Sequence, residues 1–309
     1  MQTSLRFGLE VPTMKKCIAI LMVVLMASLA LVGCGGGSGD NGDQKLEAKI
    51  NIEEILGHEP TGRLKDILDK GEIKFTTSPD YPPYEFIHPQ KSGDEQYVGA
   101  DVELAKYIAD QLGVKIKYEI MDFDGVLTLM TQGVADLAIS GLSPKPDRQE
   151  SMDFTIMYDG SGEGYHGIMV RVEDKDKYKT FEDFNGKKVA AQNGSLQQDL
   201  AEQKLTGANL ELVVKTSDGV LMLDNGNIDG LVIASTTGDS YVKNYKNLCM
   251  SSVVLDDSNV GMAAAVPKEE NSDDLLTVVN YIIEDVLEQD LFNTWVKEGK
   301  ELQDSLGIE

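Results

Sequence analysis

The sequence contains few cysteines and histidines, which limits the chemistry open to the protein. Of its three cysteines, only Cys249 lies beyond the first 34 residues. A lone thiol in an apolar run predicts an inert, buried side chain and no intrachain disulfide. His58, His88 and His166 lack the spacing of metal ligands, and motifs of serine hydrolases, P-loop NTPases and zinc proteases are absent. The sequence therefore favours a binding protein over an enzyme, with no metal or cofactor.

Basic residues are also in deficit. The chain has 28 lysines and arginines against 52 aspartates and glutamates, for a formal net charge of −24. With 41% hydrophobic residues, its composition is that of a globular protein. Because no segment concentrates enough positive charge to follow a phosphate backbone, we expect no nucleic-acid partner.

Long apolar runs are absent beyond the N-terminal region. Residues 18–32 form an apolar run of about 15 residues, which is too short for a comfortable membrane span and typical of the core of a signal peptide. Lys15 and Lys16 precede this run, and Met14, directly before them, is the expected start of translation. An ordinary signal peptide or a short anchor helix is the alternative to the interpretation that follows.

The apolar run ends in Leu-Val-Gly-Cys, with Cys34 followed by a Gly/Ser tract. This pattern resembles a bacterial lipoprotein signal. We therefore expect residues 1–33 to be a cleaved signal peptide and Cys34 to carry a lipid that anchors the protein outside the cytoplasm. Residues 34–60 would then form a lipidated, flexible tether.

Strand and helix patterns alternate in two series after residue 60, which predicts an α/β fold. The first series has expected strands at 72–77, 114–120 and 136–139 and helices at 99–112 and 123–132. The second has strands at 188–192, 210–215, 228–233 and 248–255 and helices at 196–205, 218–223 and 236–245. The repetition predicts two lobes, each a mostly parallel sheet flanked by helices. We expect lobe 1 at 61–166 and 262–309, lobe 2 at 167–261, and a hinge of two extended crossings near 165–172 and 259–267.

A polar turn follows the third strand of the first series. Ser140, Gly141 and Ser143 place hydroxyl and N–H groups at the carboxyl end of that strand, and Arg148 adds a planar fork suited to a carboxylate. Open α/β sheets bind ligands at this end of their strands. The turn therefore predicts a pocket for a small carboxylate-bearing solute, with a surface loop and a solvated arginine as the alternative.

Six segments occur in one order along the chain: TSPDYPPYEF at 77–86, VGADVELA at 98–105, FDGVLTLM at 123–130, DLAISGLSPKPDR at 136–148, GKKVAAQNGSLQ at 186–197 and NIDGLVI at 227–233. Together they resemble the extracytoplasmic solute-binding proteins of polar amino-acid ABC transporters (family 3), such as glutamine-, histidine- and lysine/arginine/ornithine-binding proteins. The resemblance implies a two-lobe periplasmic-binding-protein-like fold of type II. It also implies that the lobes close by a hinge on an amino-acid-like solute and deliver it, as a monomer, to an ABC transporter permease.

The resemblance assigns binding roles to residues of the first lobe. Arg148 matches the arginine that holds the ligand's α-carboxylate. Ser140, Gly141 and Ser143 match the turn that donates to the same carboxylate or accepts from the ammonium. Tyr81 matches the aromatic residue that stacks on the ligand.

It also assigns residues that surround the rest of the ligand. Ser78 and Gln192 match positions that contact the ligand side chain, and their neutrality favours an uncharged or flexible one. Gly194, Ser195 and Gln197 lie where a strand turns into a helix, which suits an anion. These three match the second lobe's hold on the carboxylate.

One position departs from the family pattern. The family places an aspartate, which pairs with the ligand's ammonium, where this chain has Ala234. A buried ammonium without a carboxylate is costly. Three alternatives follow: Asp80 or another acidic residue takes this role, the alignment shifts to Ser235, or the ligand lacks an α-amino group. Some proteins of this fold are cyclic-carboxylate dehydratases, so an enzyme of that kind and a ligand sensor stay open alternatives.

Overall fold

The computed structural model describes residues 46–159, 164–256, 261–270 and 272–307. The expected signal peptide, Met14 and Cys34 lie outside the described residues. Within the described ranges, no helix has the length and apolar character needed to cross a membrane.

The first sheet has five strands in the order β5-β1-β6-β13-β7. Only β13 runs against the others, because β5 and β6 pair in parallel with β1, whereas β13 pairs antiparallel with β6 and β7. The strands are β1 (Glu72–Thr77), β5 (Lys115–Ile120), β6 (Leu137–Ala138), β7 (Met152–Asp159) and β13 (Met262–Pro267). Its helices are α2 (Ile52–Leu56), α3 (Gly62–Lys70), α4 (Ala100–Leu112), α5 (Phe123–Thr131), α6 (Pro146–Gln149), α10 (Asp273–Glu288) and α11 (Leu291–Leu306).

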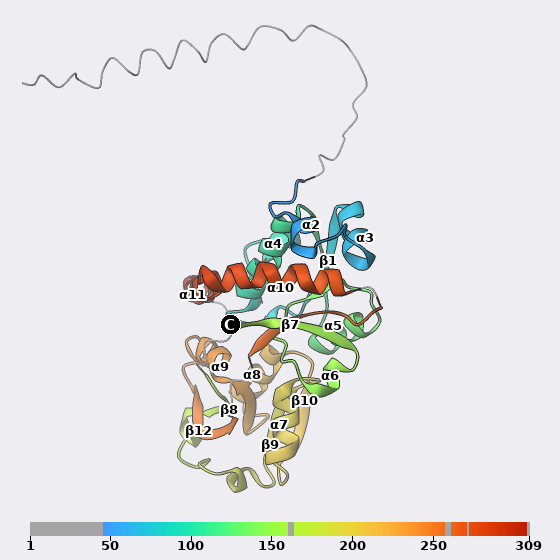
Figure 1. Cartoon of the computed structure of the whole chain (residues 1–309). Coiled ribbons are helices and arrows are strands. Elements are labelled where there is room, and N and C mark those ends of the chain that lie inside the picture. The colour runs from blue at the N-terminus through green and yellow to red at the C-terminus, as the bar shows by residue number, and fades with distance from the viewer. Residues whose placement is uncertain (1–45, 160–163, 257–260, 271, 308–309) are drawn as a thin grey trace, which may run out of the picture. The chain divides into compact units, whose positions relative to one another are not determined.

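The second sheet repeats this plan in the order β10-β9-β11-β8-β12. Here β8 is the reversed strand, since it pairs antiparallel with β11 and β12. The strands are β8 (His166–Arg171), β9 (Lys188–Gln192), β10 (Asn209–Val213), β11 (Gly230–Ala234) and β12 (Leu248–Asp256). The helices α7 (Leu196–Lys204), α8 (Thr216–Asp224) and α9 (Ser235–Val242) gather around it (Figure 1). Short 3-10 turns lie at η1 (Gly93–Gln96), η2 (Val172–Asp174) and η3 (Phe181–Phe184).

Each sheet and its helices form one lobe, and each lobe has its own apolar core. The first lobe comprises the described residues up to Asp159 and from Gly261 onward, and the second comprises 164–256. A small sheet of β2 (Asp80–Tyr81), β3 (Glu85–Ile87) and β4 (Tyr97–Val98) follows β1 in the first lobe. The arrangement confirms the predicted fold class, in which two mostly parallel sheets are flanked by helices.

The segment between the lobes differs from the expected hinge. The chain leaves the first sheet after β7, enters the second at β8, and returns between β12 and β13. Most of the crossings expected near 165–172 and 259–267 are therefore strands inside the sheets. Residues 160–163 and 257–260, which link the strands, lie outside the described residues.

The described residues that precede α3 also belong to the first lobe, because they pack against the end of helix α4. Gly113 ends the helix in the left-handed conformation with φ of 66°, and a Cβ there would lie 2.3 Å from the backbone nitrogen of Ala48. The backbone N–H of Lys49 donates to Gln111 over 2.9 Å, and Ile52 is buried. In contrast to the expected tether through residue 60, these residues pack against the lobe.

Cys249 lies on β12 and is half-buried rather than fully buried. Burial raises the pKa of its thiol. The thiol therefore stays protonated at neutral pH, which agrees with the expected lack of reactivity.

Candidate functional site

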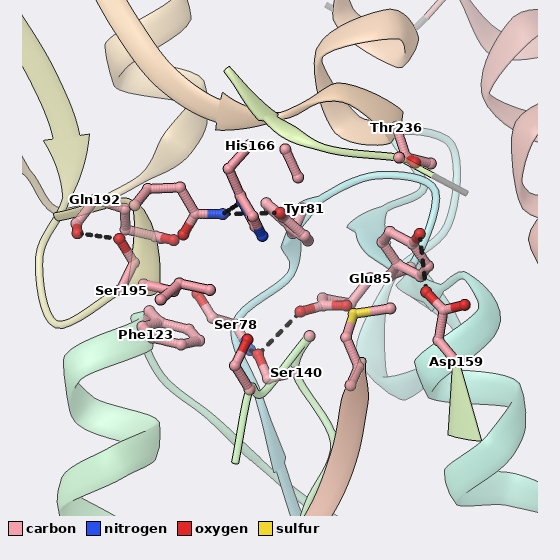
Figure 2. A pocket seen from close by; sticks show the side chains of 18 of the residues that line it. Ser78, Tyr81, Glu85, Phe123, Ser140, Asp159, His166, Gln192, Ser195 and Thr236 are labelled. Atoms are coloured by element: carbon pink, nitrogen blue, oxygen red, sulfur yellow. Dashed lines mark hydrogen bonds between the residues drawn. The ribbon is translucent and has the colours of Figure 1, made fainter. Parts of the chain in front are cut away.

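A cavity lies between the two lobes, where strands of both sheets reach their carboxyl ends (Figure 2). Its wall includes ten of the eleven residues for which the sequence suggested a ligand-binding role, and Gly194 is the exception. The ten are Ser78, Asp80, Tyr81, Ser140, Gly141, Ser143, Arg148, Gln192, Ser195 and Gln197. The structure thus gathers residues that are up to 119 positions apart around one cavity.

Arg148 is held in the short helix α6, which begins at Pro146. Its side chain is buried, its guanidinium lies over the ring of Phe123 at 5.4 Å, and it donates to the carbonyl oxygens of Ser143 at 2.9 Å and Gly194 at 2.8 Å. Its Nε has no hydrogen-bond partner among the described residues. Burial lowers the pKa of Arg148 to about 10. A desolvated guanidinium bonded only to carbonyls favours the binding of an anion.

The Ser140–Gly141 turn is bonded within the first lobe. The Ser140 hydroxyl accepts from the Ser78 backbone N–H at 3.1 Å and donates to Glu85 Oε1 at 2.9 Å. The Gly141 N–H donates to Asp101 Oδ2 at 2.8 Å. These contacts fix the orientation of the turn. The Ser140 hydroxyl and the Gly141 N–H, which were expected to bind a ligand directly, therefore also hold the cavity wall in place.

Glu85 and Asp101 form a buried carboxyl pair beneath this turn. Glu85 is 1% exposed and Asp101 is fully buried. Burial, followed by the charge of Asp101, raises the pKa of Glu85 well above its usual range, and burial raises the pKa of Asp101 to about 6. The Tyr158 hydroxyl donates to Asp101 Oδ2 at 3.0 Å, which stabilises the ionised form of Asp101. Burial and the neighbouring carboxyl group therefore favour the protonated form of Glu85.

Asp80 links the two lobes. Its Oδ1 accepts from the Ser78 hydroxyl at 2.7 Å, and its Oδ2 accepts from Gln192 Nε2 at 3.0 Å and from the Thr216 backbone N–H at 2.6 Å. The Tyr241 hydroxyl donates to the Asp80 carbonyl at 3.1 Å. Burial nevertheless raises the pKa of Asp80. Ser78 and Gln192, expected to contact the ligand side chain, thus surround a carboxylate.

The start of α7 is satisfied by its own residues. The Ser195 hydroxyl caps the helix by accepting from the Gln198 N–H at 3.1 Å, and it donates to the Gln192 carbonyl at 2.7 Å. The Gly194 N–H donates to Gln198 Oε1 at 2.8 Å. Gly194 therefore faces the first lobe with its carbonyl, which binds Arg148, rather than with its N–H.

Gln197 connects the second lobe to the aromatic side of the cavity. Its Nε2 lies 3.2 Å from the Tyr81 hydroxyl and 3.3 Å from His166 Nδ1 (Figure 2). The Tyr81 ring stacks on Tyr84, with centroids 5.9 Å apart. Burial lowers the pKa of His166, so the imidazole is neutral at pH 7. Tyr81 is therefore fixed as an apolar face of the cavity, as its expected stacking role requires.

Ala234 is the last residue of β11 and pairs with His166 on β8. The next residue, Ser235, exchanges two hydrogen bonds with Tyr165: its N–H donates at 2.8 Å, and its hydroxyl accepts at 3.0 Å. The hydroxyl that a shifted alignment would offer to the ligand is thus bonded to the backbone of the chain entering β8.

Several residues of the cavity wall were not predicted. They are Tyr84, Glu85, Phe123, Asp159, His166 and Thr236, among others. Tyr84 and Glu85 belong to the same segment as Tyr81, so the sequence could have indicated that they lie near the cavity. Asp159 is the last residue of β7, and its carboxylate accepts from the Tyr84 hydroxyl at 3.4 Å.

Comparison with known proteins identifies the family of this chain. Residues 73–298 match the model of the bacterial extracellular solute-binding proteins, family 3. The chain belongs to this family. Its members act outside the cytoplasm, so the extracytoplasmic location and the binding of a solute are established at this level, and the family predicted from the six segments is confirmed.

The relatives and solved structures agree with this assignment. The arginine-binding extracellular protein ArtP of Bacillus subtilis is 29% identical over 238 residues, which cover 76% of this chain and 79% of the relative. A probable histidine-binding protein of Campylobacter jejuni is 26% identical over 225 residues, covering 73% of this chain and 83% of the relative. An amino-acid ABC transporter substrate-binding protein of Streptococcus pneumoniae, solved with L-arginine, is 31% identical with a TM-score of 0.72, covering 78% of this chain and 98% of that one.

Proposed function

We propose that the protein binds an L-amino acid with a cationic side chain, of the arginine class, and delivers it to the permease of an ABC transporter. The charge balance of the cavity carries this proposal. Arg148 is the one lysine or arginine among the described residues of the wall, which also contains Asp80, Glu85 and Asp159. Burial raises the pKa of Glu85 and favours its neutral form, and the acidic side chains of the wall still outnumber its one guanidinium.

A zwitterionic amino acid would match only part of this charge. Its carboxylate pairs with Arg148 and its ammonium with one acidic side chain. A cationic side chain adds a second ion pair, with the buried carboxylate of Asp80, and so offsets more of the cost of burying that charge. The names of ArtP and the arginine complex from S. pneumoniae support the same class of ligand.

We place the ligand with its carboxylate at Arg148, where Ser143 and Ser195 also line the wall. Its side chain runs along Tyr81 and Phe123, whose rings suit an alkyl chain and a guanidinium. The cationic end lies toward Asp80. The contacts of Asp80 with Ser78 and Gln192 hold the carboxylate that receives it, and Gln197 orients Tyr81.

In the cell envelope, the protein acts as a monomeric binding protein without catalysis, and a lipid on Cys34 anchors it to the membrane. The lobes close on the ligand, because a ligand beside Arg148, Asp80 and Tyr81 adds contacts that favour the closed state, in which these residues bond to the opposite lobe.

Isothermal titration calorimetry with matched ligands tests the proposal. L-Citrulline has the shape of L-arginine but a neutral side chain. We expect arginine to bind about 30-fold or more tightly, because a desolvated charge pair is worth about 2 kcal/mol or more. L-Glutamine and cyclic carboxylates serve as further ligands, with product analysis for the latter. Equal affinity for arginine and citrulline, or turnover of a cyclic carboxylate, would overturn the proposal.

A further inference from the structure

The described residues of the second lobe place no carboxylate in the cavity wall. Burial lowers the pKa of His166, so the imidazole is neutral as well. Ala234 stands where the family pattern has an aspartate, and the Ser235 hydroxyl is bonded to Tyr165. A buried ammonium therefore needs its counter-charge from the first lobe.

Glu85 and Asp101 of the first lobe are both bonded to the turn at Ser140 and Gly141. Glu85 Oε1 accepts from the Ser140 hydroxyl at 2.9 Å, and Asp101 Oδ2 accepts from the Gly141 N–H at 2.8 Å. Figure 2 shows Glu85 and Ser140 directed toward one another at the cavity. Among the described residues of the wall, Glu85 is thus the acidic one bonded to the turn that was expected to accept from the ligand's ammonium.

The contact between Glu85 and Asp101 requires a proton. The two carboxyl groups are hydrogen-bonded to each other, and a carboxyl group donates only when it is protonated. Glu85 Oε2 and Asp101 Oδ1 are buried and have no other hydrogen-bond partner among the described residues, so these oxygens are left for the contact. Tyr84 and Tyr158, which also face Asp101, are neutral because burial raises the pKa of both hydroxyls.

The charges around the pair favour retention of that proton. Asp80 on β2 raises the pKa of Glu85, and Asp159 at the end of β7 raises the pKa of Asp101. Both of these neighbours are acidic, so each disfavours a further negative charge on the pair. A cation beside Glu85 acts in the opposite direction and favours the ionised pair.

Ser140 connects this charge to the cavity. Its hydroxyl lines the wall, accepts from the Ser78 N–H at 3.1 Å and donates to Glu85. Because a hydroxyl has two lone pairs, the second one can accept from an ammonium. Ionised Glu85 polarises the Ser140 hydroxyl and strengthens that bond, since hydrogen bonds in a chain reinforce one another.

We propose that Glu85 balances the ligand's α-ammonium through Ser140 and releases its proton to solvent when the ligand binds. The carboxylic acid becomes a carboxylate, the proton passes to the buffer, and the ammonium keeps its three protons. The inference rests on the proposed function in one respect, that the ligand is an α-amino acid. Because the complex holds fewer protons than the free protein, the ligand affinity rises with pH through the range in which the pair titrates.

Calorimetry counts the released proton. Titration at pH 6.5 in phosphate and in bis-Tris, whose ionisation enthalpies differ, gives the number of protons released per ligand bound. 5-Guanidinopentanoate differs from L-arginine by the α-ammonium alone, whereas L-citrulline keeps this group. We expect the wild type to release about one-half to one proton with arginine and with citrulline, and close to none with 5-guanidinopentanoate.

Glu85→Gln provides the second arm, because the amide keeps the side-chain hydrogen bonds but cannot ionise. It should release no proton with arginine and bind arginine about tenfold or more weakly at pH 7. Its affinity for 5-guanidinopentanoate should stay at the wild-type value. Glu298→Gln, at an exposed position of α11 outside the cavity, is the matched control and should release protons as the wild type does.

No proton release with arginine, or equal release with arginine and its deamino analogue, would overturn the inference in the wild-type protein alone. Equal release by Glu85→Gln and the wild type would also overturn it. Arginine that binds no more tightly than citrulline would instead overturn the proposed cationic class and leave this inference standing. Failure of both amino acids to bind would overturn both.

Discussion

The Asp80 carboxylate of the first lobe accepts a 2.6 Å hydrogen bond from the backbone N–H of Thr216 at the start of α8 in the second lobe. Gln192 reaches the same oxygen from β9. Because this buried carboxylate joins the two lobes, we expect Asp80 to couple the contents of the cavity to lobe closure. A ligand cation beside Asp80 would stabilise the ionised form that accepts these bonds.

Replacing Asp80 by Asn should therefore weaken closure. The amide retains the shape but loses the charge, and charge-assisted hydrogen bonds contribute about 1.5–3 kcal/mol. We expect arginine to dissociate about tenfold faster or more in stopped-flow fluorescence. Thr216→Ala keeps the backbone donor and should dissociate at nearly the wild-type rate. Wild-type kinetics in Asp80→Asn would contradict the linking role.

Arg148→Ala should remove most ligand binding. The substitution leaves the ligand carboxylate in a buried site without its counter-charge, at a cost of about 2–5 kcal/mol. Calorimetry at neutral pH measures the loss. Arg148→Lys keeps the positive charge but not the planar fork, so its affinity should fall between those of the wild type and the alanine variant. An alanine variant with wild-type affinity would exclude Arg148 as the anchor.

The Glu85–Asp101 pair predicts a pH dependence of stability. Burial raises the pKa of both groups, to about 6 for Asp101, so the folded state retains protons that the unfolded chain has released above about pH 4.5. The free energy of unfolding contributed by the pair therefore falls as the pH rises through the raised values. Glu85→Gln keeps a donor toward Asp101 and an acceptor for Ser140 without ionising.

Thermal unfolding between pH 5 and pH 9 measures this difference. The melting temperature of Glu85→Gln relative to wild type should increase with pH. The corresponding difference in the free energy of unfolding should change by at most about 1.4 kcal/mol per pH unit for each proton involved. A constant difference across this range would show that Glu85 is ionised in the folded protein at every pH tested.

Gly141→Ala should reduce both stability and binding. Gly141 has φ of 56°, and a Cβ would lie 3.3 Å from Tyr81 Cε1. The left-handed backbone costs about 1–2 kcal/mol for a residue with a side chain, and the contact displaces the tyrosine of the cavity wall. Gly93→Ala shares a positive φ of 60° but meets no atom within 4 Å, so it should lose stability alone. A wild-type ligand affinity in Gly141→Ala as well as in Gly93→Ala would contradict this prediction.

Cys34→Ala tests the proposed lipid anchor. Without the thiol, no lipid can be attached, so the variant should appear in the soluble extracytoplasmic fraction and still bind the ligand. Membrane fractionation and incorporation of a labelled fatty acid provide the measurements. Retention of Cys34→Ala in the membrane fraction would argue for a different anchor.

The sequence by itself determined much of the local structure and ten of the residues that line the cavity. Apolar periodicity and the glycines at 99 and 113 placed α4 within one residue of its observed ends, and the bounds of β1 and β9 were predicted as they are observed. The segment order also placed Arg148 and Tyr81 at the site. These features depend on residues that are close in the chain, which is why pattern and resemblance suffice to predict them.

Only the tertiary structure decided how the polar groups are paired. Asp80 meets a backbone N–H 136 positions away, and Ser140 meets Glu85 across 55 positions. Asp159 reaches the cavity because β7 ends beside Tyr84. Periodicity reports which face of an element is buried, but the charge state and partners of a carboxylate depend on what the folded chain brings within 3 Å of it and on how much water it excludes.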